Sequence, residues 1–315
     1  MPPASSGIHH ITSIASDPQE NLRFYTREIG LRFVKRTVNF DDPGTYHLYF
    51  GDENGSPGSI MTFFPWPGVK GGRHGTGQAE EVGYAVPKSS IGWWLDRLKA
   101  RGLPHEGPTH RFDESVIALR DPDGHLVEIV GTDWAGSLRG FAGEDIPAEH
   151  AIRGFSGVSL WLRDGAATKT VLSEVFGFTE AGRDGGRLRL VAAGSDPGIG
   201  RVVDIREVGD YPAGGLGAGI VHHIAFRAAS DQQQREMAEL ARDHTRQVTP
   251  QMDRTYFRSV YFREPGGVLF EIATDAPGFT VDEPLESLGG TLKLPPQYEP
   301  HRDRIAAALP ALEES

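Results

Sequence analysis

The stretch Glu264-Pro-Gly-Gly-Val-Leu-Phe-Glu-Ile272 repeats, with the same spacing, the earlier stretch Asp121-Pro-Asp-Gly-His-Leu-Val-Glu-Ile129. Each begins with a tight turn made of an acidic residue, proline and glycine, and runs into an apolar strand that carries one glutamate. A second pair of strings also matches, Ile8-His-His-Ile-Thr12 with Val221-His-His-Ile-Ala225. Because two separate motifs recur in the same order, we interpret them as an internal repeat.

Working outward from these strings, the chain divides into four similar units. In each, a short strand leads to an amphipathic helix and then to two or three strands separated by glycine-rich turns. The units begin near Ile8, Glu81, Gly154 and Ile220. We therefore expect an N-terminal pair of units in residues 1–135, a C-terminal pair in residues 151–280, and an extension outside the repeat in residues 281–315.

The composition excludes several classes of protein. The 315 residues contain no cysteine, so a bound metal would need histidine and carboxylate ligands. A net charge of −11 argues against binding to nucleic acid or to an anionic membrane. No apolar run approaches the ~20 residues of a membrane span, and the first residues lack a signal segment. We expect a cytoplasmic protein and, as the commonest default, a homo-oligomer.

The two His-His pairs are candidate metal ligands. A strand alternates faces, so only one member of each pair is expected to point into a cavity. One histidine from each pair, together with Glu271 on the last strand of the fourth unit, would supply two imidazoles and one carboxylate. Such a set leaves three adjacent positions of an octahedron open, which suits Fe(II) and makes Mn(II) a plausible substitute.

The distribution of these residues predicts which units lie together. The first unit offers His10 but no acidic residue on its last strand, and the fourth offers His223 and Glu271. Pairing the first unit with the fourth collects all three, although sequence order would suggest pairing the first with the second. Glu128, the counterpart of Glu271 in the second unit, is then expected to be a remnant of duplication held by hydrogen bonds or solvent.

The units resemble the βαβββ modules of the vicinal oxygen chelate superfamily, which includes glyoxalases and extradiol dioxygenases, and are most similar to its hydroquinone-type ring-cleaving dioxygenases. The resemblance covers nearly the whole chain, and its most specific continuous string is Tyr261-Phe-Arg-Glu-Pro-Gly-Gly-Val-Leu-Phe-Glu271. It implies an α+β fold in which four βαβββ modules form two open barrel-like sheets. It also implies that the enzyme opens a para-dihydroxylated aromatic ring with O2.

The same resemblance implies roles for particular residues. The second histidine of each pair and the last-strand glutamate would bind Fe(II), which makes His10, His223 and Glu271 the ligands. The positions implied around the substrate and in acid–base chemistry are His9, Thr12, His222, Arg254 and Tyr261. Of these, we expect Tyr261, His9 and Arg254 to be catalytic, and His222 and Thr12 to bind the small aromatic substrate.

Other interpretations stay open at this stage. A catechol extradiol dioxygenase would use the same metal, a glyoxalase-like lyase or isomerase would use it only as a Lewis acid, and a binding or resistance module would not need all three ligands. The glycine-rich segment 68–77 lacks the Gly-Lys-Ser/Thr ending of a phosphate loop. We expect it to be a mobile loop with His74 exposed.

Overall fold

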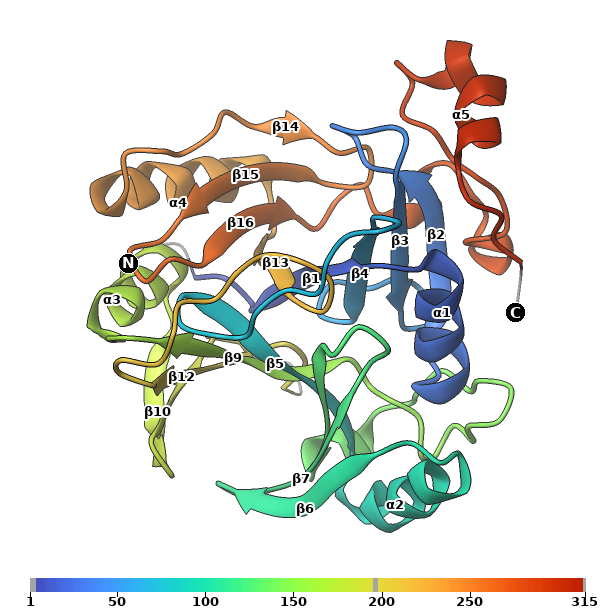
Figure 1. Cartoon of the computed structure of the whole chain (residues 1–315). Helices are drawn as coiled ribbons and strands as arrows, with labels where there is room; N and C mark the ends of the chain where they lie inside the picture. Colours follow the sequence, from blue (N-terminus) through green and yellow to red (C-terminus); the bar gives the residue numbers. More distant parts are fainter. Residues whose placement is uncertain (1–3, 195–197, 314–315) are drawn as a thin grey trace.

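The computed structural model describes residues 4–194 and 198–313, which fold into two curled eight-stranded sheets (Figure 1). In the first sheet, the order β14-β15-β16-β13-β1-β4-β3-β2 joins β1 (Ile8–Ala15), β2 (Arg32–Val38), β3 (Tyr46–Gly51), β4 (Ile60–Pro65), β13 (Val221–Ala228), β14 (Met252–Asp253), β15 (Arg258–Arg263) and β16 (Leu269–Thr274). In the second sheet, the order β10-β11-β12-β9-β5-β8-β7-β6 joins β5 (Gln78–Pro87), β6 (His105–Arg111), β7 (Glu114–Arg120), β8 (Leu126–Thr132), β9 (Phe155–Leu162), β10 (Thr179–Asp184), β11 (Arg187–Val191) and β12 (Val202–Glu207).

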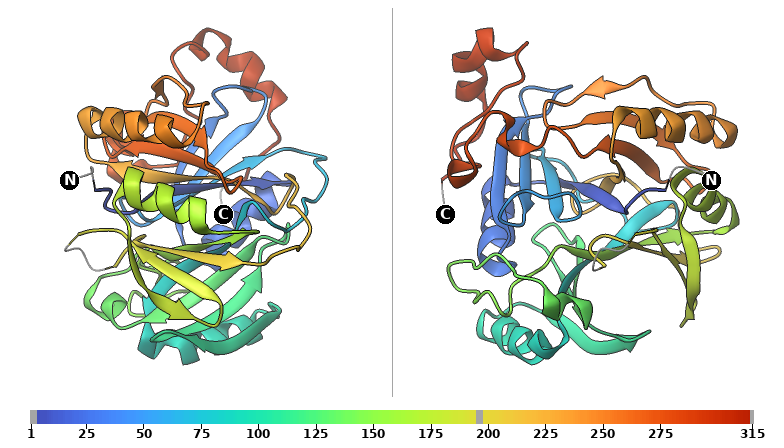
Figure 2. Two further views of the ribbon diagram at one scale, coloured as in Figure 1. Left: turned by 90° about the vertical axis from the view of Figure 1, so that its left-hand side faces the viewer. Right: turned by 180° about the vertical axis from the view of Figure 1, so that it is seen from behind.

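The strand order confirms the predicted pairing of units. The first sheet combines the first and fourth units through antiparallel pairing of β1 with β13, and the second sheet combines the second and third through β5 and β9. Figure 2 shows the two sheets lying across one another, with chain-start and chain-end colours together in the first. The α+β fold with two open barrel-like sheets is therefore confirmed.

One helix packs on each unit, and a fifth lies in the C-terminal extension. Their bounds are α1 (Pro18–Arg23), α2 (Ile91–Ala100), α3 (Ala166–Phe176), α4 (Asp231–His244) and α5 (Arg302–Ala308). The start of α1 follows from its sequence, because the Asp17 carboxylate accepts hydrogen bonds from the backbone N–H groups of Gln19 and Glu20. None of the helices within residues 4–194 and 198–313 is long and apolar enough to cross a membrane.

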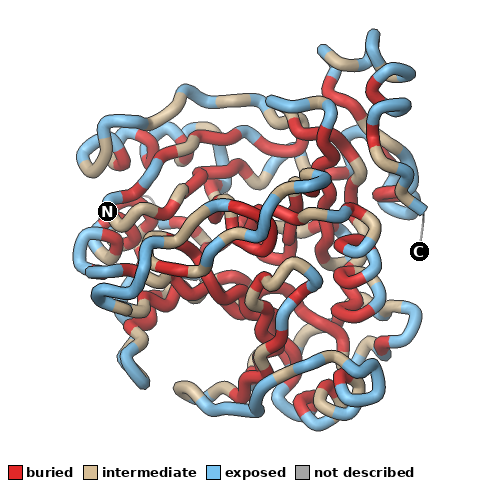
Figure 3. Tube along the Cα trace, viewed as in Figure 1, coloured by how far each residue is buried: buried red, intermediate tan, exposed pale blue. Residues whose placement is uncertain are grey.

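The two faces of the first sheet have different environments. Alternate residues such as Ile11, Ile224 and Phe270 belong to the main apolar core, which is shared with the helices and the second sheet. Figure 3 shows the buried residues concentrated along the strands of both sheets. The opposite face, which we call the site face, carries polar side chains and a smaller apolar cluster that includes Tyr49 and Phe279. Period-two alternation therefore separates the packing residues from the residues available for chemistry.

The C-terminal extension braces the edge of the first sheet. Lys35 on β2 is fully buried, and its ammonium group contacts the carboxylates of Asp282, at 2.6 Å, and Glu283. Further along, the hydroxyl of Tyr298 donates to the backbone carbonyl of Phe40 at 2.8 Å. The extension is thereby tied to the loop between β2 and β3.

The segment 68–77 is tied down by pairing with residues 213–218, through bridges that include Arg73 with Gly215. The prediction of an exposed His74 is wrong, because its ring forms an ion pair with the buried carboxylate of Glu80. The Nε2 atom of His74 also lies 3.1 Å from the carbonyl of Gly124. The hydrogen bond to Glu80 raises the pKa of His74.

Candidate metal centre

Three strands bring His10, His223 and Glu271 together on the site face. On β1 and β13, His10 lies opposite Ala225, which in turn lies opposite Glu271 on β16. One ligand atom from each of the three side chains falls within 4.8 Å of the others, and all three side chains are buried. Strand register alone therefore assembles residues that are 213 and 48 positions apart in the chain.

The carboxylate of Glu271 has one satisfied oxygen and one that is open. Its Oε1 accepts a hydrogen bond of 2.5 Å from Ser259. Its Oε2 lies 2.9 Å from Nε2 of His223 and 3.3 Å from Nε2 of His10, yet it accepts no well-aligned hydrogen bond. A fully buried carboxylate oxygen is costly to leave unpaired. The convergent Nε2, Nε2 and Oε2 atoms thus fit a divalent cation.

The protonation tendencies of these groups also suit a cation. Burial lowers the pKa of His223, which favours the neutral imidazole that metals bind. Burial acts to raise the pKa of Glu271, but the nearby His10 and His223 outweigh it and hold this pKa well below its ordinary value. The carboxyl group is therefore ionised.

Two β-bulges place a second histidine behind each candidate ligand. Ile8 pairs with Phe226 and His10 with Ala225, so His9 is an extra residue on β1. In the same way, His222 is an extra residue on β13. A bulge breaks the strict alternation of side chains. As a result, Nδ1 of His9 lies 2.9 Å from Nδ1 of His10, and Nδ1 of His222 lies 2.8 Å from Nδ1 of His223.

Next to the candidate ligands is a small cavity of about 30 Å³. Its walls are His10, Asn39, Phe40, Asp41, His47, Tyr49, Phe64, His223, Arg254, Phe257 and Tyr261. Of the residues expected around the substrate, the structure brings Tyr261 and Arg254 to this cavity. It does not bring His9, His222 or Thr12 there.

Arg254 lies between Tyr261 and the cavity rim. Its guanidinium carbon is 5.7 Å from the centre of the Tyr261 ring, and its Nη2 donates to Asp41 at 3.0 Å. Burial raises the pKa of Tyr261 and the charge of Glu271 raises it further, while Arg254 acts in the opposite sense. The net direction is upward, so the Tyr261 phenol is protonated at neutral pH in this arrangement.

Sequence reasoning missed a buried polar chain on β3 and β4. The hydroxyl of Tyr49 lies 2.8 Å from Nδ1 of His47, and Nε2 of His47 lies 2.7 Å from Oγ1 of Thr62. Thr62 donates in turn to Oγ1 of Thr12 at 3.1 Å. Thr12 is thus part of this chain rather than of the cavity wall. The alternation in Tyr46-His-Leu-Tyr49 could have shown that His47 and Tyr49 share a face.

The second sheet places different residues at the equivalent positions. Gly83 lies opposite both Gly157 and Glu128, as Ala225 lies opposite His10 and Glu271. Gly157 therefore stands where the first sheet has His10. Glu128 accepts hydrogen bonds of 2.8 and 2.6 Å from Arg111, so it is held by hydrogen bonds as predicted.

The equivalent of His223 in the second sheet is Glu81, which also forms ion pairs. Its carboxylate lies 2.7 Å from Arg187 and 2.6 Å from Arg206. Burial opposes the effect of these cations, but with Arg187 foremost they lower the pKa of Glu81 to about 2. On the second sheet, arginine side chains thus occupy the face that is equivalent to the site face of the first sheet.

Comparisons with known proteins agree with this architecture. The chain is 45% identical over 309 residues to MhqO of Bacillus subtilis (strain 168), a provisionally named ring-cleaving dioxygenase, covering 98% of this chain and 97% of that protein. It is 33% identical to the chlorohydroquinone/hydroquinone 1,2-dioxygenase of Sphingobium indicum, covering 98% and 97%. A crystal structure of a provisionally named dioxygenase from Bacillus subtilis superposes with a TM-score of 0.92, at 43% identity and 98% coverage of both chains.

More distant comparisons establish the fold. Glyoxalase I from Zea mays superposes with a TM-score of 0.61 over 85% of this chain and 92% of its own, at 15% identity. The sequence pattern of one large family matches residues 7–129 and 154–272, which together span the four modules. The chain belongs to the Glyoxalase/Bleomycin resistance protein/Dioxygenase superfamily.

Proposed function

We propose that the protein is a non-haem Fe(II)-dependent dioxygenase that opens a para-dihydroxylated aromatic ring with O2. The observation that carries this proposal is the convergence of His10 Nε2, His223 Nε2 and Glu271 Oε2 within 4.8 Å on a buried face. The names of the full-length relatives, one of them a chlorohydroquinone/hydroquinone 1,2-dioxygenase, support the substrate class. Mn(II) is the alternative metal, since it accepts the same donor set.

The metal would be held by His10, His223 and Glu271. When bound, Fe(II) would supply Lewis acidity that favours a deprotonated substrate hydroxyl, and redox chemistry toward O2. Each ligand is oriented from behind, because Ser259 donates to the carboxylate and His9 and His222 engage the Nδ1 atoms of the imidazoles. Such outer contacts fix the tautomer and direction of metal-binding groups.

Tyr261 and Arg254 are two polar side chains of the cavity wall that can act on a substrate there. The protonated Tyr261 phenol can donate a hydrogen bond to a substrate oxygen, and Arg254 can stabilise negative charge that develops there. Phe40, Phe64 and Phe257 supply an apolar wall suited to an aromatic ring. His9, His222 and Thr12 would then act through the ligands or through the threonine chain.

Substrate entry requires side chains to move. A cavity of about 30 Å³ has room for roughly one water molecule and not for a six-membered ring. At its rim, the ion pair between Arg254 and Asp41 joins the β14 segment to the β2–β3 loop, and the Asp41 side chain is 67% exposed. Opening the pair would let the exposed Asp41 carboxylate turn into water, whereas the Arg254 side chain is only 14% exposed and stays at the cavity.

An oxygen-electrode assay of Fe(II)-loaded protein tests the proposal. We expect rapid O2 uptake with 1,4-dihydroxybenzenes, slower uptake with catechols and none with the methylglyoxal–glutathione adduct. Preferred uptake with catechols would assign the catechol extradiol reaction instead. Turnover of the adduct without O2 uptake would assign a glyoxalase-like reaction, and activity retained after complete metal removal would exclude both dioxygenases. A cytoplasmic location and a homo-oligomeric state stay predictions from the sequence.

A further inference from the structure

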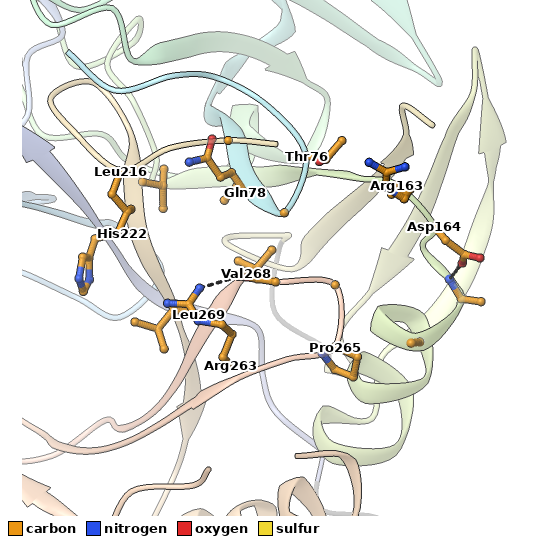
Figure 4. A pocket seen from close by; sticks show the side chains of 18 residues that line it. Thr76, Gln78, Arg163, Asp164, Leu216, His222, Arg263, Pro265, Val268 and Leu269 are labelled. Carbon is orange, nitrogen blue, oxygen red and sulfur yellow. Dashed lines mark hydrogen bonds between the residues drawn. The ribbon is translucent and has the colours of Figure 1, made fainter. Parts of the chain in front are cut away.

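A second and much larger cavity lies where an end of the first sheet meets the second sheet. Its volume is about 720 Å³, within the ~300–1,000 Å³ typical of small-molecule sites. Its walls include residues 76–79 at the start of β5, residues 163–164 and 166–167 around the start of α3, residues 263 and 265–269 of the hairpin between β15 and β16, and Leu216 (Figure 4). The ring of His222 lines the same cavity.

His222 has one nitrogen facing the metal ligands and one without a protein partner. Its Nδ1 lies 2.8 Å from Nδ1 of His223. Within residues 4–194 and 198–313, its Nε2 makes no hydrogen bond. The corresponding His9 differs, because it is buried and does not line this cavity. The fold therefore encloses His9 but leaves one side of His222 open to the cavity.

The proton on that open nitrogen follows from the metal centre. If His223 binds a cation through Nε2, its Nδ1 carries the proton and donates to Nδ1 of His222. A neutral His222 then carries its own proton on Nε2. Because Nδ1 of His222 accepts this hydrogen bond, it carries no proton, and the ring is neutral. The cavity thus receives an N–H donor from this ring.

Arg263 adds a positive charge at the same end of the cavity, below His222 in Figure 4. Its Nη1 donates to the carbonyl of Gly267 at 2.6 Å. In the described part of the chain it forms no ion pair, whereas Arg258 on the same strand pairs with Asp231 at 2.5 Å. The guanidinium therefore keeps donors for a bound group.

The carboxylates near this cavity are either engaged by hydrogen bonds or, as with Asp164 in Figure 4, at the end opposite His222. Asp164 accepts a hydrogen bond of 2.8 Å from the backbone N–H of Ala166 at the start of α3. Glu264 accepts from Thr168 at 2.6 Å and from the backbone of its own turn. What remains available beside His222 is a neutral N–H group and an unpaired guanidinium. Such a pair selects an acceptor with negative charge, and a planar carboxylate matches the guanidinium geometry.

We infer that this cavity binds a small unsaturated carboxylate of the class that ring opening would produce. The inference rests on the proposed function. Opening a six-carbon para-diol beside one hydroxyl cleaves the bond between the hydroxyl carbon and its neighbour. Both atoms of O2 enter the product, the hydroxyl carbon becoming a carboxylate and the neighbour an aldehyde, so no further oxidant or reductant is needed. The substrate is neutral and the product is an anion, and the cavity distinguishes them by charge.

Isothermal titration calorimetry of the metal-loaded protein tests this inference with two matched probes. Sorbate is a stable six-carbon unsaturated carboxylate, and 2,4-hexadien-1-ol is its neutral counterpart. We expect sorbate to bind about 10-fold or more tightly than the alcohol, and Arg263→Gln to remove this difference. The control Arg258→Gln, on the same strand, is expected to bind sorbate like the wild type.

Three results would overturn the inference. The first is that sorbate does not bind to the wild type, and the second is that it binds to Arg263→Gln as tightly as to the wild type. The third is that sulfate at the same concentration displaces sorbate, which would mean that any inorganic anion suffices. The titration requires no turnover. Sorbate binding through Arg263 in a protein that shows no O2 uptake would leave the cavity site standing and refute ring cleavage. O2 uptake by the wild type, together with unchanged sorbate binding in Arg263→Gln, would support ring cleavage and refute the cavity site.

Discussion

Replacing Ser259 by alanine should weaken metal binding without disturbing the fold. The serine is fully buried, and its hydroxyl donates a 2.5 Å hydrogen bond to Oε1 of Glu271. A hydrogen bond to a charged group contributes about 1.5–3 kcal/mol. At ~1.4 kcal/mol per factor of ten, this corresponds to a loss of about 10- to 150-fold in metal affinity. The range overlaps the 10- to 100-fold typical of groups that orient metal ligands.

The assay is a titration of apo-protein with Mn(II), followed by the loss of the free-ion EPR signal. Ser13→Ala is the matched control, because Ser13 is also fully buried on the first sheet but donates to the backbone carbonyl of Ile220 at 2.8 Å. We expect the control to bind Mn(II) like the wild type. An unchanged affinity in Ser259→Ala would refute the reasoning, and so would an equal loss in both variants.

Three further predictions concern other parts of the molecule. His223→Ala should lose both metal and turnover, as measured by metal analysis and O2 uptake, while a His301→Ala control on the exposed extension keeps both. Tyr261→Phe should keep its metal but slow ring opening by ~10²–10⁴, and an unchanged rate would make Tyr261 a packing residue. Lys35→Met should lower the free energy of unfolding by ~3–5 kcal/mol in urea titrations, because it leaves the buried Glu283 unpaired, and adding Glu283→Gln should restore most of it. The pKa of Glu283 is lowered in the fold: burial opposes this, but Lys35 outweighs it. The pair therefore stabilises above the ordinary carboxyl pKa, and the gap between wild type and Lys35→Met should close as the pH falls through the lowered value.

The repeat in the sequence predicted four modules and the neighbours of the candidate site, while the two open barrel-like sheets were implied by the family resemblance. Matching strings placed His10 and His223 at the same position of two modules, and Glu271 on the strand next to His223. Because the other modules lack one or more of these residues, the pairing of the first module with the fourth followed from chemistry rather than from sequence order. The strand order agrees with that argument.

What the sequence could not show depends on single-residue irregularities and on distant contacts. Strand alternation predicts that His9 and His222 point away from their neighbours, but one extra residue on each strand turns them onto the Nδ1 atoms of His10 and His223. No local pattern marks such a bulge. Likewise, nothing around Lys35 indicates that its charge is neutralised by a segment about 250 residues later.

Comparison of the two sheets shows what the fold itself contributes to the candidate site. Both sheets have the same strand arrangement, and each has a glutamate at the position of Glu271. In the second sheet, however, Glu128 is neutralised by Arg111, and glycine replaces the first imidazole. Within residues 4–194 and 198–313, no arginine pairs with Glu271, and two imidazoles face its open oxygen instead. The scaffold supplies only the register. A few side chains decide whether the glutamate is neutralised by an arginine of the chain or left available to a cation from solution, which is why the same fold can present a candidate metal centre on one sheet and an ion-pair network on the other.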